Sequence, residues 1–242
     1  MEVHAHTHTP RKKWTHYFWE FIMLFLAVFC GFLAEYKLEQ TIERHREKEF
    51  IISMIEDAAA DTANINEAIP LNLDRATYAD SIAFACLNYK GTQKENTAIY
   101  KAFQKCIYRP DLVYPSDRTL FQLKNSGGMR LIRKKKAAEI IMTYDNSGKR
   151  LVNQQSYYEI YLTKATESSA RMMNFREFWG NKAHREFDSV KLINADETNL
   201  LALANNAVLF KGVLLQYINR LREMKEAAVL LINNLKKEYH LE

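Results

Sequence analysis

The sequence predicts an all-α protein in which an N-terminal transmembrane helix continues into a long helix. That long helix is expected to pack with two long C-terminal helices and a helical insertion as a bundle. One apolar stretch near the N-terminus is long enough to cross a bilayer, and apolar residues elsewhere recur at spacings of three and four. Only seven Gly and four Pro occur in 242 residues, whereas a β-sandwich of this length needs many turn residues.

Composition limits the membrane-embedded part to that one stretch. Hydrophobic residues make up 48% of the chain and charged residues 26%, which is typical of globular domains. The mean hydropathy is slightly negative, which excludes a polytopic membrane protein. The net charge of +5 is spread among interspersed Glu and Asp, so the sequence does not favour a nucleic-acid partner.

The first two elements are a short polar tail over residues 1–15 and a transmembrane helix over residues 16–36. Fourteen apolar residues run without a break from Phe21 to Ala34, and a helix of about 20 residues crosses the ~30 Å hydrocarbon core. Aromatic residues stand at both ends, where interfacial anchors are expected. The residues assigned to this anchor are Trp14, Tyr17, Trp19, Glu20, Ala27, Gly31 and Tyr36.

Two other interpretations of this stretch are a buried core helix and a removed signal peptide. A buried helix has no need of the aromatic residues and the basic run at one edge. A signal peptidase requires small residues just before its cleavage site, and the bulky Phe32 breaks that pattern two residues before Ala34. Within the span, Glu20 is explained by an interfacial position or by pairing with a partner subunit, and Ala27 with Gly31 forms a small-residue pair that lets two spans approach closely.

Charged residues around the span predict its orientation. Arg11, Lys12 and Lys13 lie in a short tail before it, while the basic residues after it are diluted by glutamates. The positive-inside rule therefore predicts a cytoplasmic N-terminus. We expect a single pass through the bacterial inner membrane, with the C-terminal domain in the periplasm or otherwise outside the cytoplasm.

The helical soluble domain over residues 37–242 begins with a rod helix over 37–69 and a helical hairpin over 70–109. Pro70 suits the first turn of a new helix, so the rod is expected to end near Ile69. A capping box from Thr92 to Glu95 predicts the start of the second hairpin helix. The apolar stripe of the rod consists of Ile51, Ile55, Ala58, Thr62, Ile65 and Ile69.

A loop-rich helical insertion over 110–148 and two long helices over 149–242 complete the domain. The insertion is expected to hold a short helix carrying Leu120, Phe121 and Leu123. A further helix in it should end at the turn-forming run from Asp145 to Gly148. Asp196 is a suitable N-cap for the last helix.

Cys86 and Cys106 fall on the inward faces of the two hairpin helices. Outside the cytoplasm a disulfide between them would persist. Their distances from the turn differ by about five residues, or some 7 to 8 Å of helical rise, which strains disulfide geometry. The sequence therefore leaves two alternatives for Cys86 and Cys106: a disulfide, or two buried free thiols.

Two segments resemble a known family. The span entered through Trp19-Glu20 is followed by a charged helix reading REKEFIISMIEDAAADTANI, and a later segment reads LFQLKNSGGMRLIRKKKAAEIIMTYDN. Over residues 15–65 and 119–146 the chain is similar to a family of single-span bacterial membrane proteins catalogued as a domain of unknown function. The resemblance implies the topology and brings no activity with it; the Phe-rich span departs from the Ile/Val-rich span usual in the family.

The densest basic cluster is a candidate for contact with an anion or a lipid head group. It follows Ser126-Gly127-Gly128, whose backbone amides could hold an anion; a solvated surface is the alternative. The cluster consists of Arg130, Arg133, Lys134, Lys135 and Lys136.

Other polar groups have simpler interpretations. His4, His6 and His8 lie in a tail that would make only a weak metal site. The acidic row Glu35, Glu39, Glu43 and Glu47 is typical of a solvated helix face. His184, with Arg185, Glu186 and Asp188 nearby, is typical of a polar connection between helices.

Catalytic motifs for metalloproteases, serine hydrolases, thiol redox enzymes and dinucleotide-binding enzymes do not occur in the sequence. We therefore expect no enzyme activity, no cofactor and no metal. The favoured function is a membrane-anchored helical interaction or scaffold protein, or an accessory subunit of a membrane complex. Its expected partners are the lipid bilayer and either a second copy or another membrane protein. The alternative is an extracytoplasmic sensory or small-ligand-binding bundle.

Overall fold

The computed structural model describes residues 13–107, 111–176, 187 and 190–241. The described residues form five α-helices and one short 3-10 helix, and they contain no strand beyond one isolated bridge between Met173 and Leu192. The chain divides into two compact units, one up to Glu49 and one from Phe50 onward. The predicted all-α fold is confirmed.

Helix α1 runs from Trp14 to Leu87. Its first part belongs to the unit that ends at Glu49, and the large apolar side chains between Trp14 and Tyr36 are mostly exposed. Among the described residues, length and composition make this helix one of two that could cross a membrane; the other is α6 (Glu197–Tyr239).

The predicted break at Pro70 is wrong, because α1 continues through it. A proline inside a helix removes one backbone hydrogen bond and costs about 3 kcal/mol. The buried stripe nevertheless keeps its helical phase across the proline, from Ile65 and Ala68 before it to Ala76 and Ala79 after it. Packing on both sides therefore holds the helix together where its local sequence favours an end.

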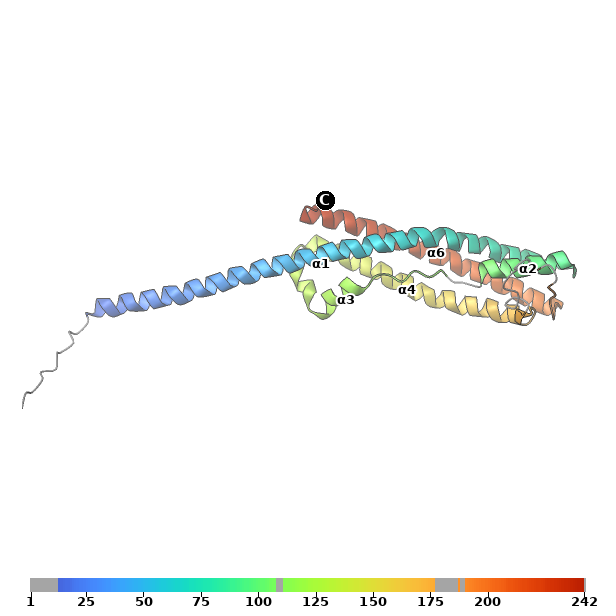
Figure 1. The fold of residues 1–242 in the computed structure, drawn as a ribbon, viewed down its shortest axis with the longest axis horizontal. Coiled ribbons are helices and arrows are strands. Elements are labelled where there is room, and N and C mark those ends of the chain that lie inside the picture. Colours follow the sequence, from blue (N-terminus) through green and yellow to red (C-terminus); the bar gives the residue numbers. More distant parts are fainter. Residues whose placement is uncertain (1–12, 108–110, 177–186, 188–189, 242) are drawn as a thin grey trace, which may run out of the picture. The chain divides into compact units, whose positions relative to one another are not determined.

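The second unit, which we call the body, is built on three long helices: α1 from Phe50, α4 (Lys135–Ala170) and α6 (Figure 1). Ser168 near the end of α4 is hydrogen-bonded to Asn206 near the start of α6. Lys134, the N-cap residue of α4, donates to the Glu238 carbonyl near the end of α6. The two helices are therefore antiparallel. In the core between them the Tyr158 ring packs edge-on against Phe210 and Tyr217, at centroid distances of 5.2 and 5.3 Å.

The predicted turn from Asp145 to Gly148 is also wrong, because α4 is continuous through it. Asp145 pairs with Lys149 one turn later, a spacing that stabilises helices. The Ser147 hydroxyl donates to the Thr143 carbonyl. Side-chain contacts within the helix thus outweigh the turn propensity of these residues.

The described part of the body also contains two shorter α-helices, α2 (Gln93–Cys106) and α3 (Arg118–Asn125). The predicted capping box at Thr92 and Glu95 is confirmed, and so is the Asp196 N-cap, which accepts a hydrogen bond from the Asn199 amide. A 3-10 helix, η1 (Gly128–Leu131), follows α3.

Candidate functional site

Residues 111–117 form an extended segment that we call the strap. It has no regular secondary structure, so its backbone groups need partners from elsewhere in the protein. At its first residue, the Asn72 amide donates to the Asp111 carbonyl at 3.1 Å. The buried Arg75 guanidinium donates to the Asp111 carboxylate at 2.7 and 2.9 Å and to the Cys106 carbonyl at 2.9 Å. Helix α1 therefore fixes the start of the strap.

The middle of the strap is held at Val113 by the other two long helices. The Gln155 amide on α4 donates to the Val113 carbonyl at 2.6 Å, and the Val113 amide donates to the Tyr217 hydroxyl on α6 at 2.8 Å. Both backbone groups of this buried residue are thus satisfied by side chains. Burial raises the pKa of Tyr217, so the hydroxyl stays neutral.

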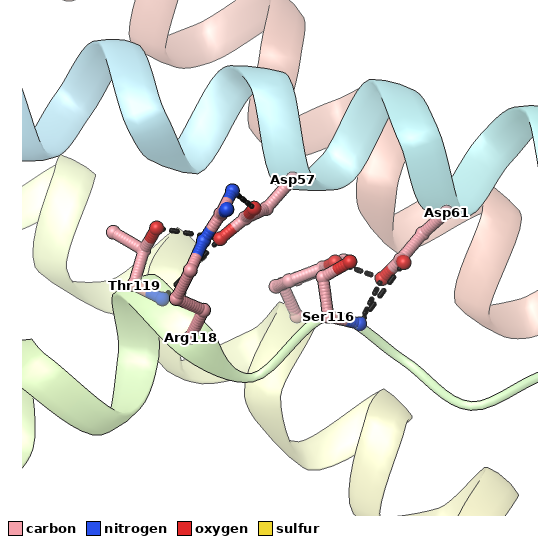
Figure 2. A network of polar contacts seen from close by, with 6 residues as sticks. Asp57, Asp61, Ser116, Arg118 and Thr119 are labelled. Carbon is pink, nitrogen blue, oxygen red and sulfur yellow. Dashed lines mark hydrogen bonds and ion pairs between the residues drawn. The ribbon is translucent and has the colours of Figure 1, made fainter.

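Two buried aspartates of α1 hold the end of the strap and the start of α3 (Figure 2). Asp61 accepts the Ser116 amide at 3.0 and 3.1 Å and also accepts the Tyr144 hydroxyl. Asp57 accepts the amide and the hydroxyl of Thr119 at 3.3 and 2.5 Å, and its other oxygen pairs with Arg118 at 2.8 Å.

An open cavity of about 540 Å³ lies beside the strap. Gly148 forms part of its wall, and the exposed residues Tyr114 on the strap and Phe121 on α3 line it. Its lining consists of Tyr114, Pro115, Ser116, Asp117, Leu120, Phe121, Lys124, Tyr144, Asp145, Gly148, Lys149, Val152, Asn153 and Met224. Its size falls in the range of small-molecule sites.

The charged side of the cavity is a carboxylate held between two ammonium groups. The Asp145 carboxylate lies 2.5 Å from the Lys124 Nζ and 2.8 Å from the Lys149 Nζ. Burial acts to raise the pKa of Asp145, but the two lysines outweigh it and the pKa lies below its ordinary value. The hydrogen bond to Asp145 raises the pKa of Lys149. Asp145 and Lys149 are therefore both charged at neutral pH.

A second surface feature is an exposed apolar face on α6, which we call the α6 face. It consists of Leu201, Val208, Leu215 and Val229, all exposed and spaced by seven or fourteen residues. Arg222 occupies the remaining position of the repeat. Only 39% of the most apolar 18-residue stretch of α6 is buried inside the protein.

Helix α1 contributes an exposed aromatic ring beside this face. Lys211 on α6 pairs with Asp80 on α1 at 2.6 Å. Helices α1 and α6 run in opposite directions in the body (Figure 1), so Phe84 and Val208, each one turn from that pair, lie at the same level. Phe84 is exposed, so the apolar surface extends from α6 onto α1.

The predicted basic cluster packs in part against the C-terminal end of α6. Lys134 donates to the Glu238 carbonyl and lies over the Tyr239 ring. Lys136 pairs with the Glu238 carboxylate at 3.8 Å, and Lys135 pairs with Glu139 at 3.8 Å. Cations are favoured at a helix C-terminus. These contacts give the cluster a structural role; contact of Arg130 and Arg133 with an anion or a head group stays a prediction.

In the predicted anchor, Glu20 lies 3.0 Å from His16, one turn earlier on α1. Gly31 has nothing within 4 Å of the position that a Cβ would occupy. The surface beside Ala27 and Gly31 is therefore open in the single chain.

Cys86 and Cys106 are both buried and are free thiols in the structure. Of the two alternatives that the sequence left open, the structure contains the unbridged one. Burial raises the pKa of each thiol to about 12.

The predicted metal-binding tail with His4, His6 and His8 and the polar string at His184 lie outside the described residues. Within the described ranges no group of three or more His, Cys, Asp or Glu side chains could hold a metal ion. The strap anchors were missed by sequence reasoning, because nothing in the local sequence distinguishes Asp57 or Asp61 from surface charges. Spacing could have identified one part of the cavity: Asp145 and Lys149 form an i,i+4 pair.

No protein-family model, curated protein or solved structure matches this chain. The resemblance to a domain-of-unknown-function family therefore stays a prediction.

Proposed function

We propose that this chain is a membrane-anchored helical interaction protein that associates with a second copy of itself through the α6 face. The observation that carries the proposal is the seven-residue spacing of exposed apolar side chains on that face. A seven-residue repeat is the pattern by which one helix packs along another. Large apolar surfaces exposed on a soluble body commonly mark interaction sites.

Small and polar residues between the apolar ones support a helix as the occupant. Asn205, Gly212 and Asn219 lie four residues after Leu201, Val208 and Leu215 and are also exposed. No atom lies within 4 Å of the position of a Cβ on Gly212, so a neighbouring helix could approach closely there. Asparagine in such a seam fixes the register of the pair at some cost in stability.

Membrane anchoring supports a second copy as the partner. In this proposal residues 16–36 cross the bacterial inner membrane, the N-terminus is cytoplasmic and the body lies outside the cytoplasm. Two copies inserted in the same direction are related by a two-fold axis along the membrane normal, so each residue near the axis meets its own counterpart. Ala27 and Gly31 would let the two spans approach closely.

Cysteine crosslinking in native membranes tests this proposal. In a Cys30→Ala background, Val208→Cys and Leu215→Cys should each give a disulfide-linked dimer on mild oxidation. Glu159→Cys, exposed on α4, is the matched control and should stay monomeric. Crosslinks from Glu159→Cys alone, or from neither face, would refute self-association through α6. Crosslinks between Val208→Cys and a different protein would make another membrane protein the partner.

The Glu159→Cys variant also tests the topology. A membrane-impermeant maleimide should label it in cells whose outer membrane is permeable and whose inner membrane is intact. Labelling that requires rupture of the inner membrane would place the body in the cytoplasm and reverse the proposed orientation.

A further inference from the structure

We propose that the cavity beside the strap binds a small amphipathic organic acid, with its carboxylate at Lys124 and Lys149 and its apolar part against Phe121 and Tyr114. This site is separate from the α6 face and does not depend on self-association. The argument rests on the charges, the aromatic side chains and the glycine that line the cavity.

The two lysines provide the acid-binding end. Each ammonium group carries three N–H donors, and each is ion-paired with Asp145. Two positive charges beside one carboxylate leave one positive charge uncompensated at this end. Charge-assisted hydrogen bonds from an ammonium to a carboxylate are stronger than neutral ones. An organic anion therefore fits this end better than a neutral or cationic molecule.

Asp117 is the other acidic side chain of the lining, and it lies at the opposite end of α3 from Lys124. Seven residues of helix separate the two, which corresponds to about 10 Å along the axis. Phe121 lies between them, one turn from each. The cavity wall thus runs from a positive end, past an aromatic side chain, to a negative end, and this gradient orients an acid towards the lysines.

The apolar wall is accessible to a ligand. Tyr114 is 66% exposed and Phe121 is 64% exposed, although both rings border a cavity that could bury them. An apolar group placed against these side chains would remove part of their surface from water, which is favourable in proportion to the apolar area covered.

Gly148 preserves space in the cavity. Glycine in a helix interior costs about 1 kcal/mol relative to alanine. A Cβ at this position would meet Pro115 at 3.6 Å and Met224 at 3.9 Å, which are ordinary contacts. Packing therefore does not require glycine, and a larger side chain here would occupy the space that a ligand needs.

Isothermal titration of the full chain in lipid nanodiscs tests the proposal with a matched set of probes. The probes are 2-naphthoate, the neutral 2-naphthamide and the cationic 2-naphthylmethylamine; empty nanodiscs give the background. We expect saturable binding of 2-naphthoate, and binding at least about tenfold weaker for the other two, because they lack the charge-assisted contacts.

Variants locate the binding. Lys124→Gln and Lys149→Gln should each weaken 2-naphthoate binding about tenfold, and Val152→Trp, which fills the cavity from an exposed position on α4, should abolish it. Lys211→Gln is the matched control, because Lys211 is 33% exposed like Lys124 and also pairs with an aspartate. It should leave the affinity unchanged.

Two results would overturn the proposal. One is the absence of saturable 2-naphthoate binding to the wild-type chain. The other is binding that Lys149→Gln and Val152→Trp leave intact, because both positions are exposed enough for the variants to fold. Neither result bears on crosslinking through the α6 face, so this inference and the proposed function can fail separately.

Discussion

The carboxylate of Asp57 accepts the backbone amide of Thr119 and so caps α3 from a different helix. Thr119 is the second residue of α3, the position at which an N-cap side chain normally accepts its hydrogen bond. The local N-cap residue, Asp117, makes no such bond with its side chain. The start of α3 therefore depends on α1, 62 residues away in the sequence.

Replacing Asp57 with alanine should destabilise the body by about 1 to 3 kcal/mol, because the Thr119 amide loses its acceptor in a buried position. Thermal unfolding of the full chain, followed by circular dichroism, measures this change. Asp74→Ala, on an exposed position of the same helix, is the control and should cause no loss. Equal midpoints for the two variants would show that the cap contributes nothing.

Replacing Tyr217 with phenylalanine should cost about 1 to 3 kcal/mol, because the buried Val113 amide then has no acceptor. The exchange rate of the Val113 backbone amide hydrogen should be higher in the variant than in the wild type. Tyr157→Phe, at an exposed position on α4, should change neither quantity. Unchanged protection of the Val113 amide would mean that the strap does not need this anchor.

Acid should weaken the contribution of Asp145 to stability. Its pKa is lower in the folded chain than its ordinary value of 3.8, so the folded state binds this proton less tightly than the unfolded state. Its contribution is therefore full above the unfolded pKa and is lost as the pH falls through the folded pKa. Asp145→Asn should be less stable than wild type by about 1 to 2 kcal/mol at pH 7, a modest loss because Lys149 is largely exposed.

A series of unfolding midpoints from pH 7 to pH 2 checks this prediction. The difference between wild type and Asp145→Asn should shrink as the pH falls below about 4. A difference that stays constant over the series would show that the pairing with Lys124 and Lys149 does not depend on the charge of Asp145.

The buried thiols should be unreactive in the folded chain. The pKa of Cys86 and of Cys106 is about 12, so almost no thiolate forms at pH 8, and the thiolate is the reactive species. Mass spectrometry after a short maleimide pulse on Cys30→Ala protein should find no label in the native state and two labels in urea. Two labels in the native state would contradict the burial of these residues.

Replacing Pro70 with alanine should raise the stability of the body by about 1 to 3 kcal/mol, because alanine restores the missing hydrogen bond of α1. Pro115→Ala in the strap should instead lower it, since Pro115 limits the freedom of the unfolded chain. Unfolding midpoints of the two variants should therefore move in opposite directions. A drop for Pro70→Ala would mean that the proline is needed where it stands.

The sequence was sufficient for the fold class and for those features whose signals are local. The capping box at Thr92, the N-cap at Asp196 and the short helix around Leu120 each follow from neighbouring residues. The helix ends predicted at Pro70 and at Gly148 were wrong because turn residues indicate only a local preference. Packing of the buried stripe outweighs that preference at Pro70, and side-chain contacts within α4 outweigh it before Gly148.

The candidate site was harder to predict because its parts are far apart in the sequence. Arg75 and Asp111 are separated by 36 residues, and Val113 and Tyr217 by 104. In a single sequence each of these polar residues resembles a solvated one. Only the fold shows that they are buried and which backbone groups they serve.

The anchoring of the strap has a consequence for the order of events during synthesis. Ribosomes add about 5 to 20 residues per second, so Val113 is made roughly 5 to 20 seconds before Tyr217. During that interval α1 and α4 can form their own helices, but the strap between them lacks its α6 contact. The nascent body therefore reaches its native packing only after translation of α6, and until then its unpaired backbone and apolar side chains are open to chaperones and proteases.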